Sequence, residues 1–151
     1  MRIRVTRTIN APTPILWEYL RDYANIHRFH PGVRYSEFTE GTTRNGIDST
    51  RVCYFHTGDS LRERVTQWKE GESYTVEIYE STMPFQNGKA TLGVRELPNG
   101  QSQAYMEMEL KPTKRWMAPM MYLMFRFKAA PSILKGLEDL YRSEHTLHIF
   151  A

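Results

Sequence analysis

The chain has 151 residues, of which 40% are hydrophobic and 25% charged, so one domain of this size can bury a core without a metal or a disulfide. The net charge is +3, but basic residues alternate with acids, as in Leu61-Arg62-Glu63-Arg64, which argues against nucleic-acid binding. Cys53 is the only cysteine, and since the N-terminal residues lack an apolar run and the longest apolar stretch is short, we expect neither a secretory signal nor a membrane-spanning helix. We therefore expect a single soluble, cytoplasmic domain over residues 1–151.

The N-terminal part combines one strand with two short helices. Apolar and polar residues alternate from Arg2 to Ile9, which predicts a half-buried strand. Thr13 and Pro14 then provide signals for the start of a helix, with Thr13 as its cap. We expect this helix over residues 14–22, followed by a helical turn over residues 25–29.

From Val33 to Lys111 apolar and polar residues again alternate with a period of two. This pattern predicts six strands, over residues 33–40, 48–57, 60–69, 74–83, 89–97 and 103–111. The breaks between them are short and consist of turn-forming residues. Consecutive strands joined in this way form antiparallel hairpins, because parallel strands require long crossover connections.

The remainder of the chain is predicted to be helical, with a bend near Pro131, since proline removes a helical hydrogen bond. Its first half, residues 116–127, is apolar nearly all round, whereas a surface helix shows a polar face. Three roles fit this segment: it covers the mouth of a pocket, touches a membrane surface beside nearby Lys and Arg residues, or is buried in a dimer interface.

The predicted order is therefore β-α-α-β6-α, an α+β fold with a seven-stranded curved antiparallel sheet around a long C-terminal helix. A helix is about 10–12 Å across, whereas seven strands at a spacing of about 4.8 Å are much wider. The sheet must curl around the helix or leave apolar surface uncovered. This geometry predicts an internal cavity suited to an apolar small molecule.

Several segments also resemble a known family. They are Ile9-Asn10-Ala11-Pro12, Leu16-Trp17-Glu18-Tyr19-Leu20, Phe29-His30-Pro31-Gly32-Val33 and the strand pair Leu61-Arg62-Glu63-Arg64-Val65-Thr66-Gln67-Trp68 with Tyr74-Thr75-Val76. In this order they resemble the polyketide cyclase/dehydrase and lipid-transport family, part of the START-related, Bet v 1-like helix-grip (SRPBCC) superfamily. The resemblance implies a helix-grip fold with a ligand cavity. It implies no single function, because such folds serve binding, transport and cyclisation alike.

The residues capable of chemistry form no recognisable catalytic set. The histidines, at positions 27, 30, 56, 145 and 148, lack the spacing of a zinc site, so no metal and no cofactor are expected. His56 lies in a predicted strand and is the candidate general base. Cys53 is expected to be a small buried hydrophobe.

The strand carboxylates are expected mainly on the solvent face, opposite arginines of neighbouring strands. The strand from Ser60 stays open in this respect, because a one-residue slip exchanges its two faces. In one register the inward residues are Leu61, Glu63, Val65 and Gln67. In the other they are Arg62, Arg64 and Trp68.

Three functions follow from these features. The first is binding or transport of a hydrophobic small molecule, such as a lipid, a quinone or a polyketide-like compound, by a monomer or homodimer. The second is a polyketide cyclase or dehydratase. The third is a protein- or membrane-interaction module that uses residues 116–127, with transient membrane contact. The candidate ligand-binding residues are Tyr54, His56, Tyr79, Tyr105, Met117, Met121, Met124 and Phe125.

Overall fold

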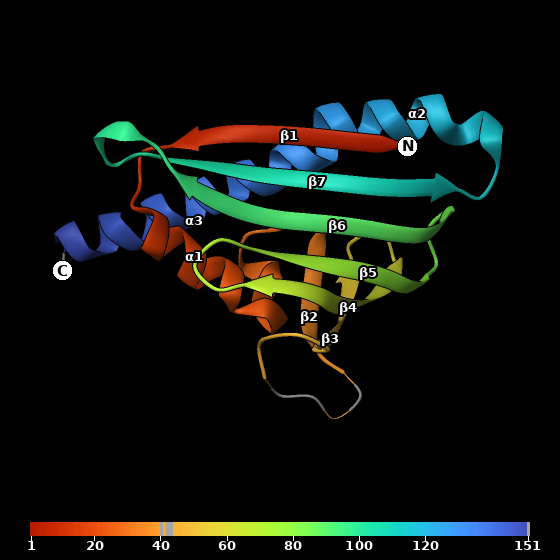
Figure 1. Cartoon of the computed structure of the whole chain (residues 1–151), viewed down its shortest axis with the longest axis horizontal. Coiled ribbons are helices and arrows are strands. Elements are labelled where there is room, and N and C mark those ends of the chain that lie inside the picture. The colour runs from red at the N-terminus through yellow and green to blue at the C-terminus, as the bar shows by residue number, and fades with distance from the viewer. Residues whose placement is uncertain (40, 42–43, 151) are drawn as a thin grey trace.

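The computed structural model describes residues 1–39, 41 and 44–150, apart from the side chains of Gln86 and residues 146–150. Seven antiparallel strands form one curved sheet in the order β1-β7-β6-β5-β4-β3-β2 (Figure 1). The strands are β1 (Arg2–Ile9), β2 (Val33–Phe38), β3 (Thr50–Phe55), β4 (Ser60–Lys69), β5 (Ser73–Ser81), β6 (Phe85–Glu96) and β7 (Ser102–Pro112). The predicted antiparallel sheet is confirmed, and β1 returns to pair with β7.

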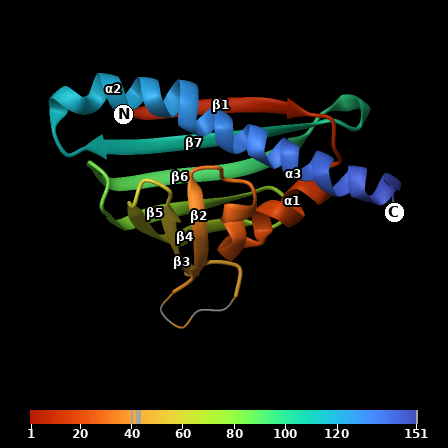
Figure 2. The same ribbon diagram turned by 180° about the vertical axis from the view of Figure 1, so that it is seen from behind.

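The helical elements lie at the start and the end of the chain. Helix α1 (Thr13–Arg21) and the 3-10 helix η1 (Tyr23–Arg28) connect β1 to β2, and the single turn η2 (Pro98–Gly100) separates β6 from β7. The C-terminal part consists of η3 (Arg115–Met117), α2 (Ala118–Met124), the π-helical η4 (Phe125–Ala129) and α3 (Ala130–Phe150). Figure 2 shows this long helix crossing one face of the sheet, which confirms the α+β helix-grip architecture.

The interruption of the C-terminal helix lies just before Pro131 rather than at it. In the π-helical turn η4 the Ala130 N–H donates to the carbonyl of Phe125. Proline has no N–H and its ring crowds the carbonyl four residues earlier, so a wider turn accommodates Pro131 without ending the helix. No helix among the described residues is long and apolar enough to cross a membrane.

Three local expectations were wrong. Thr13 does not cap α1, because its hydroxyl is hydrogen-bonded to that of Ser102 at 2.7 Å and Pro12 occupies the cap position. The strand predicted over residues 48–57 is shorter, since Asp48 has a φ of 69°, which extended strands do not adopt. Strand β6 begins at Phe85, earlier than expected, because Asn87 (φ 50°) forms a bulge and not a turn.

One predicted strand boundary cannot be compared with the structure. Glu40, the expected end of the first strand after Val33, lies outside the described residues.

Close packing fixes the position of α3. A Cβ atom at Gly136 would lie 1.9 Å from the carbonyl oxygen of Phe29, so α3 approaches the end of η1 too closely for any other residue. Arg7 of β1 donates to Glu138 at 2.8 Å, and Tyr19 of α1 donates to Glu144 at 2.9 Å. These contacts tie α3 to β1, α1 and η1.

Candidate functional site

Aromatic side chains close the end of the sheet next to α1. Trp17 of α1 meets Trp68 edge-on, with ring centroids 5.4 Å apart, and Trp68 stacks on Tyr74 at 5.7 Å. Trp68 reaches this position because a bulge in β4 between Val65 and Gln67 shifts the alternation by one residue. The interior is therefore filled with rings at this end.

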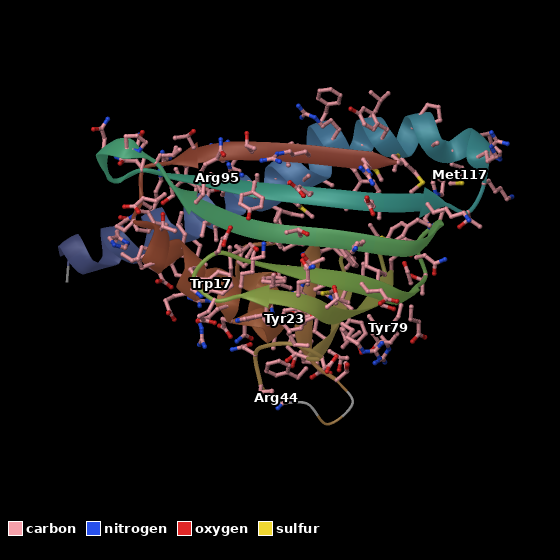
Figure 3. The ribbon with its side chains drawn as sticks, viewed as in Figure 1. Trp17, Tyr23, Arg44, Tyr79, Arg95 and Met117 are labelled. Atoms are coloured by element: carbon pink, nitrogen blue, oxygen red, sulfur yellow. The ribbon has the colours of Figure 1, made fainter. Side chains whose placement is uncertain are left out.

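The opposite end of the sheet lies beneath α2, and we call it the α2 end. The turns β3–β4 and β5–β6, the last residues of β7 and the turn at residues 30–32 before β2 all meet there, as the antiparallel registers require. Figure 3 shows Met117 and Trp17 at opposite ends of the molecule.

Apolar side chains gather at the α2 end. Phe85 and Met121 are buried, whereas Phe55, Met83, Met117 and Phe125 pack against the core but remain partly exposed. These six residues are named the apolar cluster. The rings of Phe85 and Phe125 meet edge-on at 6.1 Å, so the sheet and η4 touch here. Half-buried phenylalanines and flexible methionines form a surface that can repack around an irregular guest.

A charged pair lies deeper in the interior. Arg51 of β3 and Glu63 of β4 are direct cross-strand partners, and the guanidinium donates to both carboxylate oxygens at 3.4 and 3.3 Å. Arg51 also donates to the Tyr23 carbonyl at 2.9 Å and to the Tyr74 hydroxyl at 3.3 Å. Both side chains are buried, at 2% and 9% exposure. Up to Val65 the strand therefore follows the register in which Glu63 faces inward, whereas beyond the bulge Trp68, which belongs to the other register, faces inward.

The pKa values of four groups in this cluster are raised. Burial disfavours the charge of Arg51, but the adjacent carboxylate of Glu63, with Tyr74 and Tyr23, outweighs it and raises the pKa of Arg51. Burial also raises the pKa of Tyr23, Tyr74 and the Cys53 thiol. Arg51 therefore stays charged and the other three groups stay protonated, so none of these four groups supplies a nucleophile or a base at neutral pH.

His30 differs from the buried pair because, among the described residues, one of its ring nitrogens has no partner. Its Nδ1 accepts the N–H of Gly32 at 3.2 Å, and its ring meets Phe55 edge-on at 5.7 Å. Burial and the nearby charge of Arg51 lower its pKa to about 4. At neutral pH the imidazole is uncharged, and the bond at Nδ1 assigns the proton to Nε2. Within the described residues Nε2 has no hydrogen-bond partner.

All three of the tyrosines predicted to bind a ligand lie on the outer face of the sheet. Tyr54 is half-buried opposite Tyr35, and Tyr79 lies beneath the guanidinium of Arg64 at 4.7 Å. Tyr105 lies over Gly93 and beneath Arg4 and Arg95. Each alternates with an inward residue of its strand, so these tyrosines are separated from the interior by the sheet.

Of the other predicted residues, some face the core at the α2 end and some face solvent. Met117, Met121 and Phe125 belong to the apolar cluster, whereas Met124 is 48% exposed and faces away from the core. His56 was expected in a strand as the candidate general base, but it lies exposed in the β3–β4 turn. Sequence reasoning did not select His30, although its position before Pro31 marked it as part of a fixed turn.

The other polar residues make structural contacts. On the outer face Arg4 pairs with Glu107 at 2.8 Å and Arg62 with Glu80 at 3.3 Å, as predicted for cross-strand pairs. His27 is hydrogen-bonded to Ser36 at 2.7 Å. The described residues contain no group of His, Cys, Asp and Glu side chains suited to a metal ion, and the side chain of His148 lies outside that description.

The hollows on the surface of the described residues include the following two. One, of about 380 Å³, lies on the outer face of the sheet beside Lys89 and Thr91. The other, of about 510 Å³, lies between α1 and the β4–β5 turn beside Trp17 and Gly71. Neither lies between the sheet and α3, so the internal cavity expected from the sequence stays a prediction.

Solved structures of similar fold come from several bacteria. They include an uncharacterised protein from Bacillus thuringiensis (18% identity, 92% of this chain and 97% of that chain, TM-score 0.78). The protein XoxI from Bacillus cereus gives 19% identity, 91% and 93% coverage and a TM-score of 0.77. A protein from Thermobifida fusca is 20% identical, with 93% of this chain and 92% of that chain covered, and has a TM-score of 0.78. At these identities the likeness concerns the fold.

The sequence of this chain matches a protein family but no individual curated protein. No curated protein gives a significant sequence match. The family model described as polyketide cyclase/dehydrase and lipid transport, by contrast, matches residues 1–142. That match covers the strands, α1, α2 and most of α3. The chain therefore belongs to the polyketide cyclase/dehydrase and lipid-transport family.

Proposed function

We propose that the protein binds a hydrophobic or amphipathic small molecule, such as a lipid, a quinone or a polyketide-like compound, inside the helix grip at its α2 end. The observation that carries this proposal is the apolar cluster, whose partly exposed Phe55, Met83, Met117 and Phe125 pack against the buried core. Membership of a family that includes lipid transport supports it.

The chemistry of the interior suits recognition of such a guest. Apolar contact would contribute roughly 25 cal/mol per Å² of buried surface before the cost of ordering. Because Met117, Met121 and Phe125 are flexible or half-buried, the guest would displace them from the core as it enters. His30 would donate from Nε2 to a carbonyl or hydroxyl oxygen of the guest, which fixes its orientation.

A fluorescent fatty-acid titration of two neighbouring variants tests this site. Phe125→Glu places a carboxylate among the apolar cluster, whereas Met124→Glu places the same charge on the exposed side of the same helix. Burying an unpaired charge costs several kcal/mol, so Phe125→Glu should weaken binding at least about tenfold. Met124→Glu should bind like the wild type.

The thermal stability of both variants must be measured alongside. A Phe125→Glu protein that is folded and binds the fatty acid as tightly as the wild type would refute the site. Equal weakening by both variants would refute it as well, because it would place the probe on the outer surface.

Cyclase or dehydratase activity is the second candidate, and His30 is the observation that favours it. A neutral donor near a buried arginine could polarise a substrate carbonyl. The test is turnover of short poly-β-ketone thioesters by the wild type and by His30→Gln. Turnover that disappears in the variant while fatty-acid binding persists would support the enzyme; no turnover by the wild type would count against it.

A further inference from the structure

The segment from Lys114 to Lys128, here named the α2 segment, presents large apolar side chains to solvent. Trp116 is 71% exposed, Phe127 65%, Met120 59% and Leu123 57%. Met124 and Tyr122 are also exposed, at 48% and 39%. Elsewhere in the described chain only Tyr35 and Ile47 are comparably exposed large hydrophobics. Exposed apolar side chains concentrated in this way mark an interaction surface.

These side chains lie on one face of the segment. Trp116, Met120, Leu123 and Phe127 follow one another at intervals of three and four residues, which places them on the same side of a helix. The opposite side carries Met117, Met121 and Phe125 of the apolar cluster. The α2 segment therefore touches the protein interior with one side and solvent with an equally apolar other side.

Positive charge surrounds the exposed face. No Asp or Glu occurs between Leu110 and Leu137, whereas Lys114, Arg115, Arg126 and Lys128 all lie within the α2 segment. Among the described residues no carboxylate pairs with any of these four. Most arginines of the strands are by contrast paired, as Arg4 is with Glu107.

We propose that the α2 segment docks on the surface of an anionic lipid bilayer. Trp116, Met120, Leu123 and Phe127 would enter the boundary between headgroups and acyl chains, and the cations would contact lipid phosphates. A second copy of this chain fits less well, because a two-fold interface would bring the same cations together. Docking does not require a bound guest, so its test is independent of the interior site.

The first measurement uses the full chain with vesicles at low ionic strength. Vesicles of equal parts phosphatidylcholine and phosphatidylserine should co-sediment the protein at least about tenfold better than phosphatidylcholine alone. Trp17 is buried and Trp68 half-buried, so Trp116 reports on the contact. Its emission should shift to the blue and be quenched by brominated lipid. Trp116→Phe should still sediment but lose that shift.

Matched variants then assign the binding to this surface. Met120→Glu/Leu123→Glu should lose vesicle binding by about tenfold or more, whereas Tyr35→Glu/Ile47→Glu changes the same charge at the other exposed hydrophobics and should bind normally. Arg126→Gln/Lys128→Gln should weaken binding about tenfold or more, because it removes two cations that would contact lipid phosphates. Lys69→Gln/Lys89→Gln, with the same net charge, should have a much smaller effect.

Three results would overturn the proposal. The first is that anionic vesicles fail to bind the wild type at low salt. The second is that the test and control variants lose binding equally. The third is a concentration-dependent dimer that Met120→Glu dissociates, in a protein that does not bind vesicles, which would assign the surface to a second copy.

Discussion

Substitution of Glu63 tests how much the buried ion pair contributes to the free energy of unfolding. Arg51 is 2% exposed in its side chain, and Glu63 is its only charged partner among the described residues. Glu63→Leu therefore leaves a charged guanidinium in the core, which typically costs about 3–5 kcal/mol. For a chain of this length that corresponds to a fall in melting temperature of about 6–20 °C.

The same substitution on the outer face provides the control. Glu107 faces Arg4 across β1 and β7 at 2.8 Å, but the two side chains are 46% and 52% exposed, so Glu107→Leu should change the free energy of unfolding by less than about 1 kcal/mol. Urea and thermal unfolding measure both variants.

A double-mutant cycle separates the pair from its surroundings. Arg51→Met/Glu63→Leu removes both charges and should be more stable than Glu63→Leu alone by at least about 1 kcal/mol, although it leaves the Tyr74 hydroxyl without its partner. The buried pair is not coupled as described if Glu63→Leu is no more destabilising than Glu107→Leu. The same holds if the effects of the single variants Arg51→Met and Glu63→Leu on the free energy of unfolding add up to that of the double variant.

Three further predictions concern the interior. His30 has a pKa of about 4 in the folded protein and about 6.5 when unfolded, so the unfolded state gains a proton first. Wild-type stability should fall relative to His30→Gln by up to about 3 kcal/mol between pH 6.5 and 4; parallel curves for His30→Gln and wild type would contradict this. Gly136→Ala should lower the free energy of unfolding by about 1–3 kcal/mol or more, because its Cβ meets the Phe29 carbonyl, whereas exposed Lys135→Ala should have little effect; equal melting temperatures would refute the close approach. Cys53 is buried and its pKa is raised, so iodoacetamide should label it only as the protein unfolds, and rapid labelling of the native state would be incompatible with this core.

The order of elements could be predicted because it depends on local pattern. Alternating residues, short polar breaks and an apolar helical stripe determined seven antiparallel strands and a long C-terminal helix. The predicted ends of strands were wrong where residue type alone does not determine the backbone conformation. Asn87 could serve a turn or a bulge equally well, and β6 uses it as a bulge.

The candidate site was harder to predict because it depends on which face of each strand is buried. Arg62–Glu80 and Arg51–Glu63 are both cross-strand Arg–Glu pairs, yet only the second lies inside. Tyr54 and Tyr79 alternate with inward residues, so a one-residue change of face moves them across the sheet. Met117, Met121, Met124 and Phe125 were all chosen as ligand-binding candidates because residues 116–127 are apolar nearly all round. The pattern therefore could not show that Met124 alone of these four faces away from the core.

Native mass spectrometry of the freshly purified protein tests the central claim most directly. If the α2 end admits an apolar guest, the wild type should carry an additional small-molecule mass that organic extraction releases. Folded Phe125→Glu should lack that mass, and Met124→Glu should retain it. A wild type without any added mass that also fails to take up fatty acid, lipid or quinone would contradict the proposed binding function.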